Sequence, residues 1–251
     1  MTLKKHIPNL ITLLNVFCGS VAVIFAANSN FIMAAIFVFL GIFFDFFDGL
    51  IARKLNVQSE LGIQLDSLAD MITSGVVPGI IMFKLLSLVV NPTDAFISEE
   101  WNSYFRLSGV EASLLPFIAL LIPMASAYRL GRFNIDENQQ TYFIGLPTPA
   151  NTLLIVSLPL ILEFQNNDIM NSIILNKWFL IVLTFLSAYL LNSNIKLFAL
   201  KFSDWSFKSN SIRYVYILLC VISLVTLQFA AIPLLVVIYI VMSLLNNLSS
   251  K

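Results

Sequence analysis

Residues 45–53 read Asp45-Phe46-Phe47-Asp48-Gly49-Leu50-Ile51-Ala52-Arg53, and after eight further residues come Gly62, Asp66 and Asp70. The four aspartates lie at the ends of two strongly apolar segments. An ionised carboxylate is costly in apolar surroundings, so an acidic residue within a membrane span indicates a functional site. The pattern predicts metal-dependent chemistry at a membrane.

The composition places the chain among integral membrane proteins. Hydrophobic residues make up 59% of the 251 residues, only 11% are charged, and the mean hydropathy is +0.89. These values lie far outside the usual balance of a soluble domain. The sequence has no basic tract of the kind that binds nucleic acid. We therefore expect an all-α integral membrane protein whose surroundings are membrane lipids, with no nucleic-acid partner.

Runs of about 20 apolar residues predict eight transmembrane helices. Asn28-Ser29-Asn30 separates the first two, and Gln228 with Pro233 is the only break between the last two. No linker, low-complexity segment or internal repeat divides the chain, so we expect one domain over residues 1–251. The predicted spans are 9–28, 31–53, 61–90, 112–132, 145–163, 177–192, 213–229 and 231–247.

The charges between these spans predict a cytoplasmic N-terminus, because lysine and arginine concentrate in cytoplasmic loops. The predicted outer loops, 92–111 and 164–176, are mainly acidic, and Arg106 and Lys177 are the basic exceptions on that side. We therefore expect a multi-pass protein of the cell membrane with the aspartates on its cytoplasmic side. The basic residues at the predicted inner ends are Lys4, Lys5, Arg53, Lys54, Arg129, Arg132, Lys196, Lys201, Lys208, Arg213 and Lys251.

The second predicted helix presents its polar residues on adjoining stripes. At 3.6 residues per turn, Asp45, Asp48 and Ala52 lie along one stripe. Gly49 and Arg53 form the stripe beside it. A guanidinium can hold phosphate oxygens in a bidentate geometry that a lysine does not match, so we expect Arg53 to pair with a phosphate.

The third predicted helix carries the other two aspartates. Gly62, Asp66 and Asp70 are four residues apart and therefore share one face. If this face meets the second helix, four carboxylates point to one place, and the small residues Gly49, Ala52 and Gly62 let a ligand or backbone approach closely.

Four neighbouring carboxylates repel one another strongly unless cations neutralise them. Ligation by oxygen alone favours a hard ion, Mg²⁺, Mn²⁺ or Ca²⁺, over zinc. Two ions bridged by shared carboxylates suit a phosphate or diphosphate substrate. We expect two divalent ions, and the expected ligands are Asp45, Asp48, Asp66 and Asp70.

The pattern D-x2-D-G-x2-A-R-x8-G-x3-D-x3-D is complete here and resembles the signature of the CDP-alcohol phosphotransferase family. Further runs, within residues 5–155, resemble the phosphatidylserine synthase branch of that family. The resemblance implies a six-helix core over about 5–192, two additional C-terminal helices over about 213–247, a homodimer, and a site open to the cytoplasm. The runs are 7–19, 65–70, 74–78, 128–134 and 143–150.

The resemblance also implies an activity. The phosphatidyl group of CDP-diacylglycerol, or of CDP-archaeol, passes to the hydroxyl of L-serine and CMP leaves. By the same resemblance, Asp45 and Asp66 bridge two ions and Asp48 completes one ion site. Asp70 touches the other ion and acts as the general base. A serine hydroxyl is a weak nucleophile at neutral pH, which is why a carboxylate within hydrogen-bond reach is needed.

Substrate contacts follow in part from the resemblance. Arg129 and Arg132, near the inner end of the fourth helix, could hold the carboxylate of serine; this hypothesis comes from the two residues themselves. The CDP-lipid contacts implied by the resemblance are Gly49, Ala52, Arg53, Ser59, Gly62 and the Pro8-Asn9 turn.

Two alternatives stay open at this point. Within the family, a phosphatidylglycerophosphate or phosphatidylinositol-phosphate synthase takes an acceptor that carries a phosphate and needs a denser basic pocket. From another class, a divalent-cation transporter could also line a cavity with four aspartates. Such a transporter would not need Gly49, Ala52 and Arg53 at their offsets.

Overall fold

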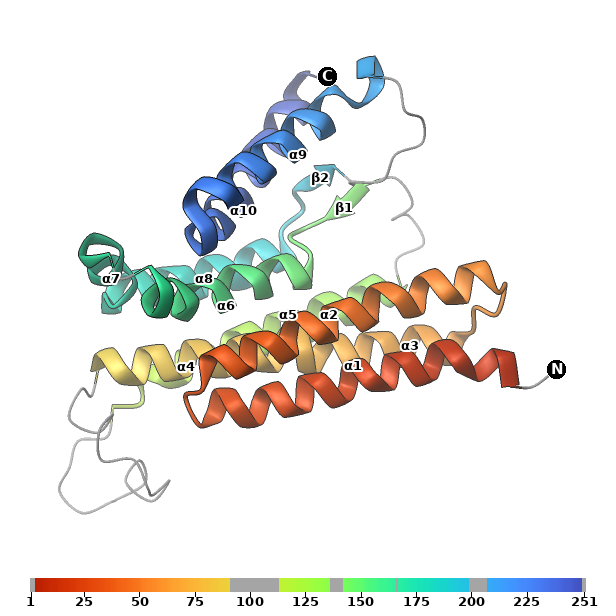
Figure 1. Cartoon of the computed structure of the whole chain (residues 1–251), viewed down its shortest axis with the longest axis horizontal. Coiled ribbons are helices and arrows are strands. Elements are labelled where there is room, and N and C mark those ends of the chain that lie inside the picture. The colour runs from red at the N-terminus through yellow and green to blue at the C-terminus, as the bar shows by residue number, and fades with distance from the viewer. Residues whose placement is uncertain (1–2, 91–112, 136–141, 166, 199–206, 250–251) are drawn as a thin grey trace.

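The computed structural model describes residues 3–90, 113–135, 142–165, 167–198 and 207–249. These residues form a helical structure with one short pair of strands, which confirms the predicted all-α class (Figure 1). The predicted outer loop 92–111 with Arg106, and the basic residues Lys201 and Lys251, lie outside the described residues.

The first two helices form a closely packed antiparallel hairpin. Helix α1 (Leu3–Ala27) and helix α2 (Phe31–Lys54) are separated at the predicted Asn28-Ser29-Asn30 turn. Asn30 caps α2 by accepting a hydrogen bond from the Met33 amide at 3.1 Å. Small residues let the two backbones approach. Those buried between the helices are Ala22, Ala26, Ala34 and Ala35.

Pro8 lies inside α1, so the predicted Pro8-Asn9 turn is wrong. The helix already begins at Leu3 and continues through the proline. Proline has no backbone N–H and removes one hydrogen bond from the preceding turn, a loss that α1 tolerates because it falls near the helix end. The Pro8 carbonyl lies 3.1 Å from the Thr12 hydroxyl oxygen, one turn later in the helix.

The third predicted span is helical but irregular. It consists of α3 (Glu60–Asp70), the π-helix η1 (Met71–Val76) and α4 (Val77–Val90). A π-turn inside a long helix often marks a functional site. Here η1 begins directly after Asp70, so the last predicted metal ligand stands where the helix geometry changes.

The π-helix packs into the α1–α2 hairpin through Thr73. Its hydroxyl donates to Asn15 Oδ1 at 2.7 Å. A Cβ atom added to Gly41 of α2 would lie 2.8 Å from Thr73 Cγ2, and one added to Gly19 of α1 would overlap the Thr73 hydroxyl. Glycine is therefore required at both positions for this close approach.

The middle of the chain builds the second half of the bundle. Its elements are η3 (Leu115–Leu120), α5 (Leu121–Ile135), α6 (Thr148–Phe164), α7 (Asp168–Ile174) and α8 (Lys177–Asn192). The sequence did not predict α7, a short helix that meets α8 at a bend of 62°. Helix α4 packs against α1, α5, α6 and α8, and so occupies the centre of the core.

The C-terminal part adds a separate layer over the bundle. Strands β1 (Tyr142–Ile144) and β2 (Lys196–Phe198) pair antiparallel, with Ile144 opposite Lys196. Helices α9 (Phe207–Leu227) and α10 (Ala231–Ser249) fold back on each other at the short helix η4 (Gln228–Ala230). Figure 1 shows this hairpin standing at an angle to the bundle, next to the two strands.

The predicted number of eight membrane spans is not confirmed. Among the described residues, four helical stretches are long and apolar enough to cross a membrane, or five if α7 and α8 together form one bent span. The difference arises because α5 has only 15 residues and α6 only 17, and because the two predicted C-terminal spans form one stretch that folds back at η4. The four stretches are His6–Ala27, Phe31–Lys54, Glu60–Val90 and Asn210–Asn247.

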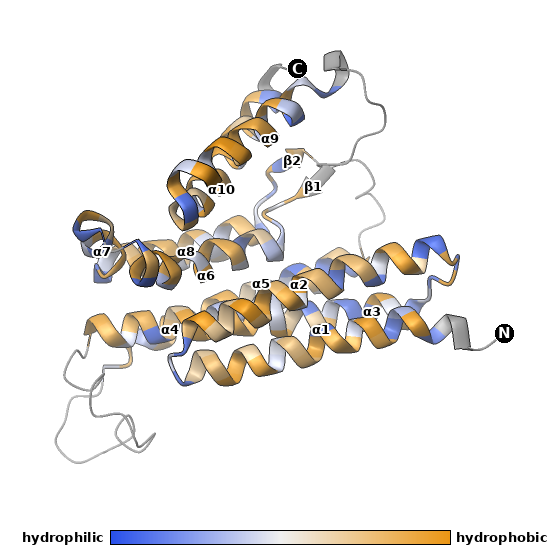
Figure 2. Ribbon diagram, viewed as in Figure 1, coloured by the Kyte–Doolittle hydropathy of each residue, from blue (hydrophilic) through white to orange (hydrophobic). Residues whose placement is uncertain are grey.

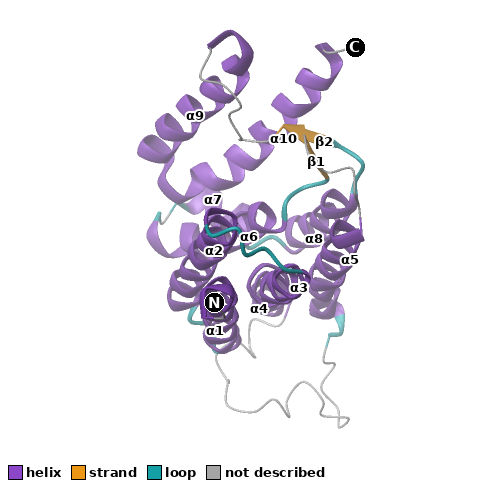
Figure 3. Cartoon of the chain, turned by 90° about the vertical axis from the view of Figure 1, so that its right-hand side faces the viewer, coloured by secondary structure: helices purple, strands orange, loops and turns teal. Residues whose placement is uncertain are grey.

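The bundle has one polar end. In Figure 2, hydrophilic residues gather on α3 and on the adjoining ends of α1 and α2. Figure 3 looks at the bundle from this end and shows α1 next to both α2 and α3, in agreement with their contacts. The apolar surface elsewhere suits a multi-pass membrane protein, so the polar end is where a water-soluble substrate can reach the helices.

We expect Gly41→Ala to destabilise the protein, because even one methyl group would press against Thr73 and Asn15. Overpacking of this kind costs about 1–3 kcal/mol. Thermal unfolding in detergent should show a lower Tm. Gly131→Ala is the matched control, since nothing lies within 4 Å of a Cβ atom there. Equal Tm values for the two variants would contradict the close packing of Thr73.

Candidate active site

Three of the four predicted ligands come together between α2 and α3. Asp45 and Asp48 project from α2, and Asp66 projects from α3. Each offers a carboxylate oxygen, and these three oxygens lie within 4.8 Å of one another. Asp48 is buried, and the other two are partly buried. The prediction that the polar faces of these helices meet is therefore correct for these three residues.

Helix α1 supplies hydrogen bonds that hold the cluster. The Thr12 hydroxyl donates to Asp48 Oδ2, and Asn15 Nδ2 donates to Asp45 Oδ1 at 3.3 Å. Both α1 side chains are buried. Because Thr73 in turn donates to Asn15, a chain of hydrogen bonds runs from the π-helix to the carboxylates. These contacts fix the direction in which the carboxylates point.

Sequence reasoning assigned no role to Thr12 or Asn15. A signal was present, because Asn9, Thr12 and Asn15 are polar residues three apart in an otherwise apolar span. That spacing keeps them near one face of a helix. Their partners lie more than 25 residues away, so the spacing alone does not say what the face contacts.

Asp70 is the last residue of α3 and is not part of the three-carboxylate cluster. Its Oδ2 accepts a hydrogen bond from the Thr148 hydroxyl at the start of α6, at 3.4 Å. On α5, Arg129 interacts electrostatically with the Asp70 carboxylate. Asp70 therefore links the carboxylate cluster to α5 and α6.

The cluster fits a divalent cation. Its donors are all carboxylate oxygens, the ligand type preferred by hard ions such as Mg²⁺ and Mn²⁺. Thr12 and Asn15 each occupy one oxygen of Asp48 and Asp45, and a carboxylate can accept several further contacts. A bound cation would offset the repulsion between the three acidic groups.

Several predicted CDP-lipid contacts meet where α3 begins. Ser59 caps this helix by accepting from the Gly62 amide at 3.1 Å. A Cβ atom on Gly62 would lie 3.2 Å from Ser59 Oγ and 3.4 Å from Asn9 Oδ1. Asn9, Ser59 and Gly62 are therefore neighbours. Pro8 is buried, and its carbonyl faces the Thr12 hydroxyl.

The remaining predicted CDP-lipid contacts are on α2. The exposed Arg53 side chain folds back along the helix, and its Nε donates to the Gly49 carbonyl at 3.0 Å. The nearest atom to a Cβ on Gly49 would be Arg53 Nη2, at 4.0 Å. Ala52 is partly buried. The small residues Gly49 and Ala52 therefore leave open space on the α2 surface beside the aspartates, and Arg53 places a positive charge there.

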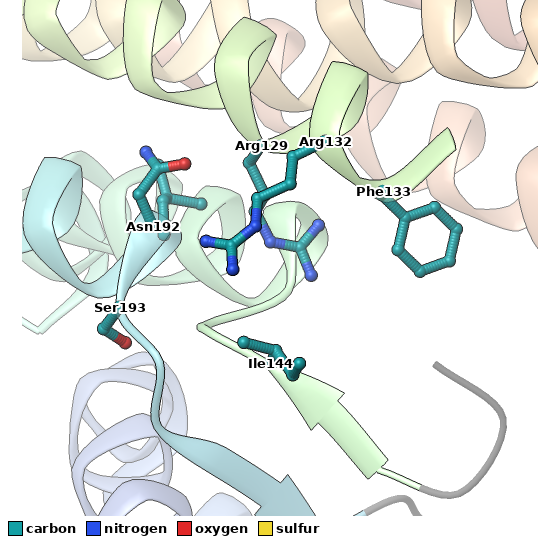
Figure 4. Close-up of a pocket in the computed structure, with 7 residues that line it drawn as sticks. Arg129, Arg132, Phe133, Ile144, Asn192 and Ser193 are labelled. Atoms are coloured by element: carbon teal, nitrogen blue, oxygen red, sulfur yellow. The ribbon is translucent and has the colours of Figure 1, made fainter. Parts of the chain in front are cut away.

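Arg129 and Arg132 of α5 line a pocket. Figure 4 shows both guanidinium groups leaving α5 for the same space, with Asn192 and Ser193 on one side and Ile144 below. Arg132 Nη2 donates to Asn194 Oδ1 at 3.3 Å. Arg129 is partly buried and reaches Asp70 electrostatically, so one arginine connects the pocket to the carboxylates.

Buried polar atoms without a partner occur on η1, α5 and α6, the elements next to Asp70. Among the described residues, the hydroxyl groups of Ser74 and Ser126 and both amide atoms of Asn151 make no hydrogen bond. The Ser74 carbonyl accepts from Thr152 of α6 at 2.9 Å, so Ser74 lies against that helix. Buried polar groups normally have partners, and water or a polar ligand can supply them here.

We expect Mn²⁺ to raise the Tm of this protein, because a ligand that binds only the folded state stabilises it. At a Mn²⁺ concentration of about 100 times Kd the gain is about 2.7 kcal/mol. Asp66→Asn should abolish the shift, since it removes one of the three clustered carboxylates. Asp168→Asn, at an exposed position on α7, is the control and should keep it. A full shift in Asp66→Asn would place the cation elsewhere.

Comparison with known proteins gives consistent matches. The chain is 34% identical over 173 residues to the CDP-diacylglycerol–serine O-phosphatidyltransferase of Bacillus subtilis, covering 67% of this chain and 81% of that protein. It is 32% identical over 151 residues to the protein of the same name from Helicobacter pylori, covering 59% of this chain and 55% of the relative. A third relative of this name, from Methanocaldococcus jannaschii, is 29% identical over 168 residues, which cover 67% of this chain and 66% of the relative.

The family model covers more of this chain than the alignments with these relatives do. The chain spans only about half the length of the Helicobacter protein. The family model for CDP-alcohol phosphatidyltransferase matches residues 5–189, which run from α1 into α8 and include the whole carboxylate site. The chain therefore belongs to the CDP-alcohol phosphatidyltransferase family.

Proposed function

We propose that this chain transfers the phosphatidyl group of CDP-diacylglycerol to the hydroxyl of L-serine, releasing CMP. The relatives described above carry this activity in their names. The observation that carries the proposal is the carboxylate cluster of Asp45, Asp48 and Asp66, with Asp70 next to it and a pocket of two arginines beyond. The carboxylate cluster is a cation site, Asp70 is a candidate base, and the arginine pocket is an anion site, and Asp70 interacts with both of the other two.

The carboxylates would hold two divalent ions, Mg²⁺ or Mn²⁺, and Ca²⁺ also suits the all-oxygen donor set. In this proposal Asp45, Asp48 and Asp66 would hold the ions together with Asp70. When bound, such ions would supply positive charge to the diphosphate of the substrate. The hydrogen bonds from Thr12 and Asn15 keep the carboxylates in a fixed orientation, which lowers the reorganisation that binding requires.

Asp70 would act as the general base. The serine hydroxyl oxygen attacks the phosphorus that bears the lipid, and its proton passes to the Asp70 carboxylate. The new phosphorus–oxygen bond forms as the bond from that phosphorus to the oxygen of CMP breaks, and CMP leaves. Thr148 holds Oδ2 of Asp70, so the carboxylate presents its other oxygen to the hydroxyl.

The CDP moiety would lie over the start of α3 and the end of α2. Arg53 can place its guanidinium against the phosphate of the departing CMP. Gly49, Ala52 and Gly62 leave space for the nucleotide. Asn9 and Ser59 offer polar side chains at the same end of the bundle.

Arg129 and Arg132 would bind the carboxylate of serine. Arg129 interacts with Asp70 and also lines the pocket, so a carboxylate held there brings the serine hydroxyl toward the base. These two arginines are the only basic side chains among the described residues that line the pocket. A phosphorylated acceptor calls for more positive charge, so the pocket favours serine over glycerol 3-phosphate or inositol phosphate.

We further propose that the whole chain is one domain, that it forms a homodimer, and that it lies in the cytoplasmic membrane with its site open to the cytoplasm. Arg53 and Lys54 end α2, and Arg132 stands in the last turn of α5. The basic residues near these two helix ends support the orientation by the positive-inside rule. CDP-archaeol stays in the proposal as a second donor, because lipid tails make only generic apolar contacts.

We expect purified protein with CDP-diacylglycerol and Mn²⁺ or Mg²⁺ to release CMP when L-serine is added. Glycerol 3-phosphate and inositol phosphate serve as parallel acceptors, and CDP-archaeol as a parallel donor. Asp70→Asn should reduce the rate at least about 100-fold, within the range that general-base catalysis contributes. Release with another acceptor would overturn serine and keep the reaction class. No release with any acceptor, together with Mn²⁺ flux into sealed vesicles, would support a transporter.

We expect Arg129→Ala and Arg132→Ala to raise the KM for L-serine about 10-fold or more, the loss that follows when a charged hydrogen bond of about 1.5–3 kcal/mol is removed. The KM for CDP-diacylglycerol should stay the same. Lys177→Ala is the control, because Lys177 stands at the opposite end of α8 from the pocket. An unchanged KM for serine in both arginine variants would show that the acceptor binds elsewhere.

A further inference from the structure

Strand β2 has one edge that β1 does not cover. The Ile195 carbonyl accepts from the Gly145 amide at 2.9 Å, so residue 195 faces the β1 side. Because successive residues of a strand alternate in direction, the carbonyls of Lys196 and Phe198 face away from β1. Lys196 is exposed and Phe198 is buried, so the Phe198 carbonyl in particular needs another partner.

Helix α10 supplies those partners. The Tyr239 hydroxyl donates to the Phe198 carbonyl at 2.8 Å, and Asn247 Nδ2 donates to the Lys196 carbonyl at 2.7 Å. The Tyr239 ring is buried and packs edge-on against the Phe198 ring, with centroids 5.0 Å apart. Both ends of the three-residue strand are therefore attached to α10.

The segment that leads into β2 forms the wall of the arginine pocket. Asn192 and Ser193 line the pocket, and Asn194 accepts the hydrogen bond from Arg132. On the other strand, Ile144 lines the pocket and pairs with Lys196. A shift of β2 would move this wall and the partner of Arg132 together.

We propose that Tyr239 and Asn247 are positioning residues that set the affinity for the acceptor by holding β2, and with it the wall of the Arg129–Arg132 pocket. This inference rests on the proposed function. Helix α10 lies beyond residues 5–189, which match the family, so acceptor binding depends on a part of the chain outside the matched region. The α9–α10 hairpin then contributes to acceptor binding, in addition to being apolar enough to lie in the membrane.

Tyr239→Phe tests the proposal, because it keeps the ring and removes only the hydroxyl. We expect the KM for L-serine to rise about 3- to 10-fold, as for the loss of one hydrogen bond. The kcat and the KM for CDP-diacylglycerol should not change. A purely structural role would instead lower the amount of active protein, and so the apparent kcat, at constant KM.

Two further variants make the test specific. Tyr216→Phe is the matched control, because the Tyr216 ring also packs against Phe198, with centroids 5.8 Å apart, while its hydroxyl contacts the Leu235 carbonyl at 3.4 Å within the α9–α10 hairpin. It should leave every kinetic constant unchanged. Asn247→Ala removes the second contact to β2 and should raise the KM for serine in the same direction as Tyr239→Phe.

Amide hydrogen exchange of residues 193–198 separates this inference from the proposed function, because it needs no turnover. Faster exchange in Tyr239→Phe, with a raised KM for serine, is the expected result. Unchanged exchange, or an unchanged KM for serine while Arg129→Ala raises it, overturns the inference alone. An unchanged KM in Arg129→Ala, or no CMP release at all, overturns the assignment of the pocket on which the inference depends.

Discussion

The structure depends on the need to accommodate a cluster of acidic groups between apolar helices. Asp45, Asp48 and Asp66 bring three carboxylate oxygens within 4.8 Å of one another, and such a group is unstable unless polar partners and cations surround it. Helix α1 meets part of this need through Thr12 and Asn15. The packing of α1 against both α2 and α3 is therefore as much a requirement of the site as of the hydrophobic core.

The π-helix links this site to the packing of the bundle. An added residue in a helical turn changes which side chains face the neighbouring helices, and here it directs Thr73 into the space left by Gly19 and Gly41. The Thr73 hydroxyl then fixes Asn15, which holds Asp45. The close packing of η1 against α1 and α2 therefore fixes the orientation of the Asp45 carboxylate.

The two sides of the site are built by different parts of the chain. The carboxylates come from α2 and α3, within the region that matches the family. The arginine pocket combines residues of α5 and β1 from that region with Leu191, Asn192 and Ser193, which follow it. Arg129 connects the two sides through its interaction with Asp70. Because α10 holds the outer edge of β2, variation in the C-terminal hairpin can alter the acceptor side without disturbing the carboxylates.

The sequence by itself determined the features that depend on neighbouring residues. The spacing of Asp45 and Asp48 gave their common helix face, the signature gave the family, and Asn28-Ser29-Asn30 gave the first turn. Only the tertiary structure decided which polar residues meet that face. Thr12 lies 36 residues from Asp48, Thr148 lies 78 from Asp70, and Tyr239 lies 41 from Phe198. Such contacts, the π-turn and the number of spans arise from packing between distant segments, and a local periodicity carries no information about them.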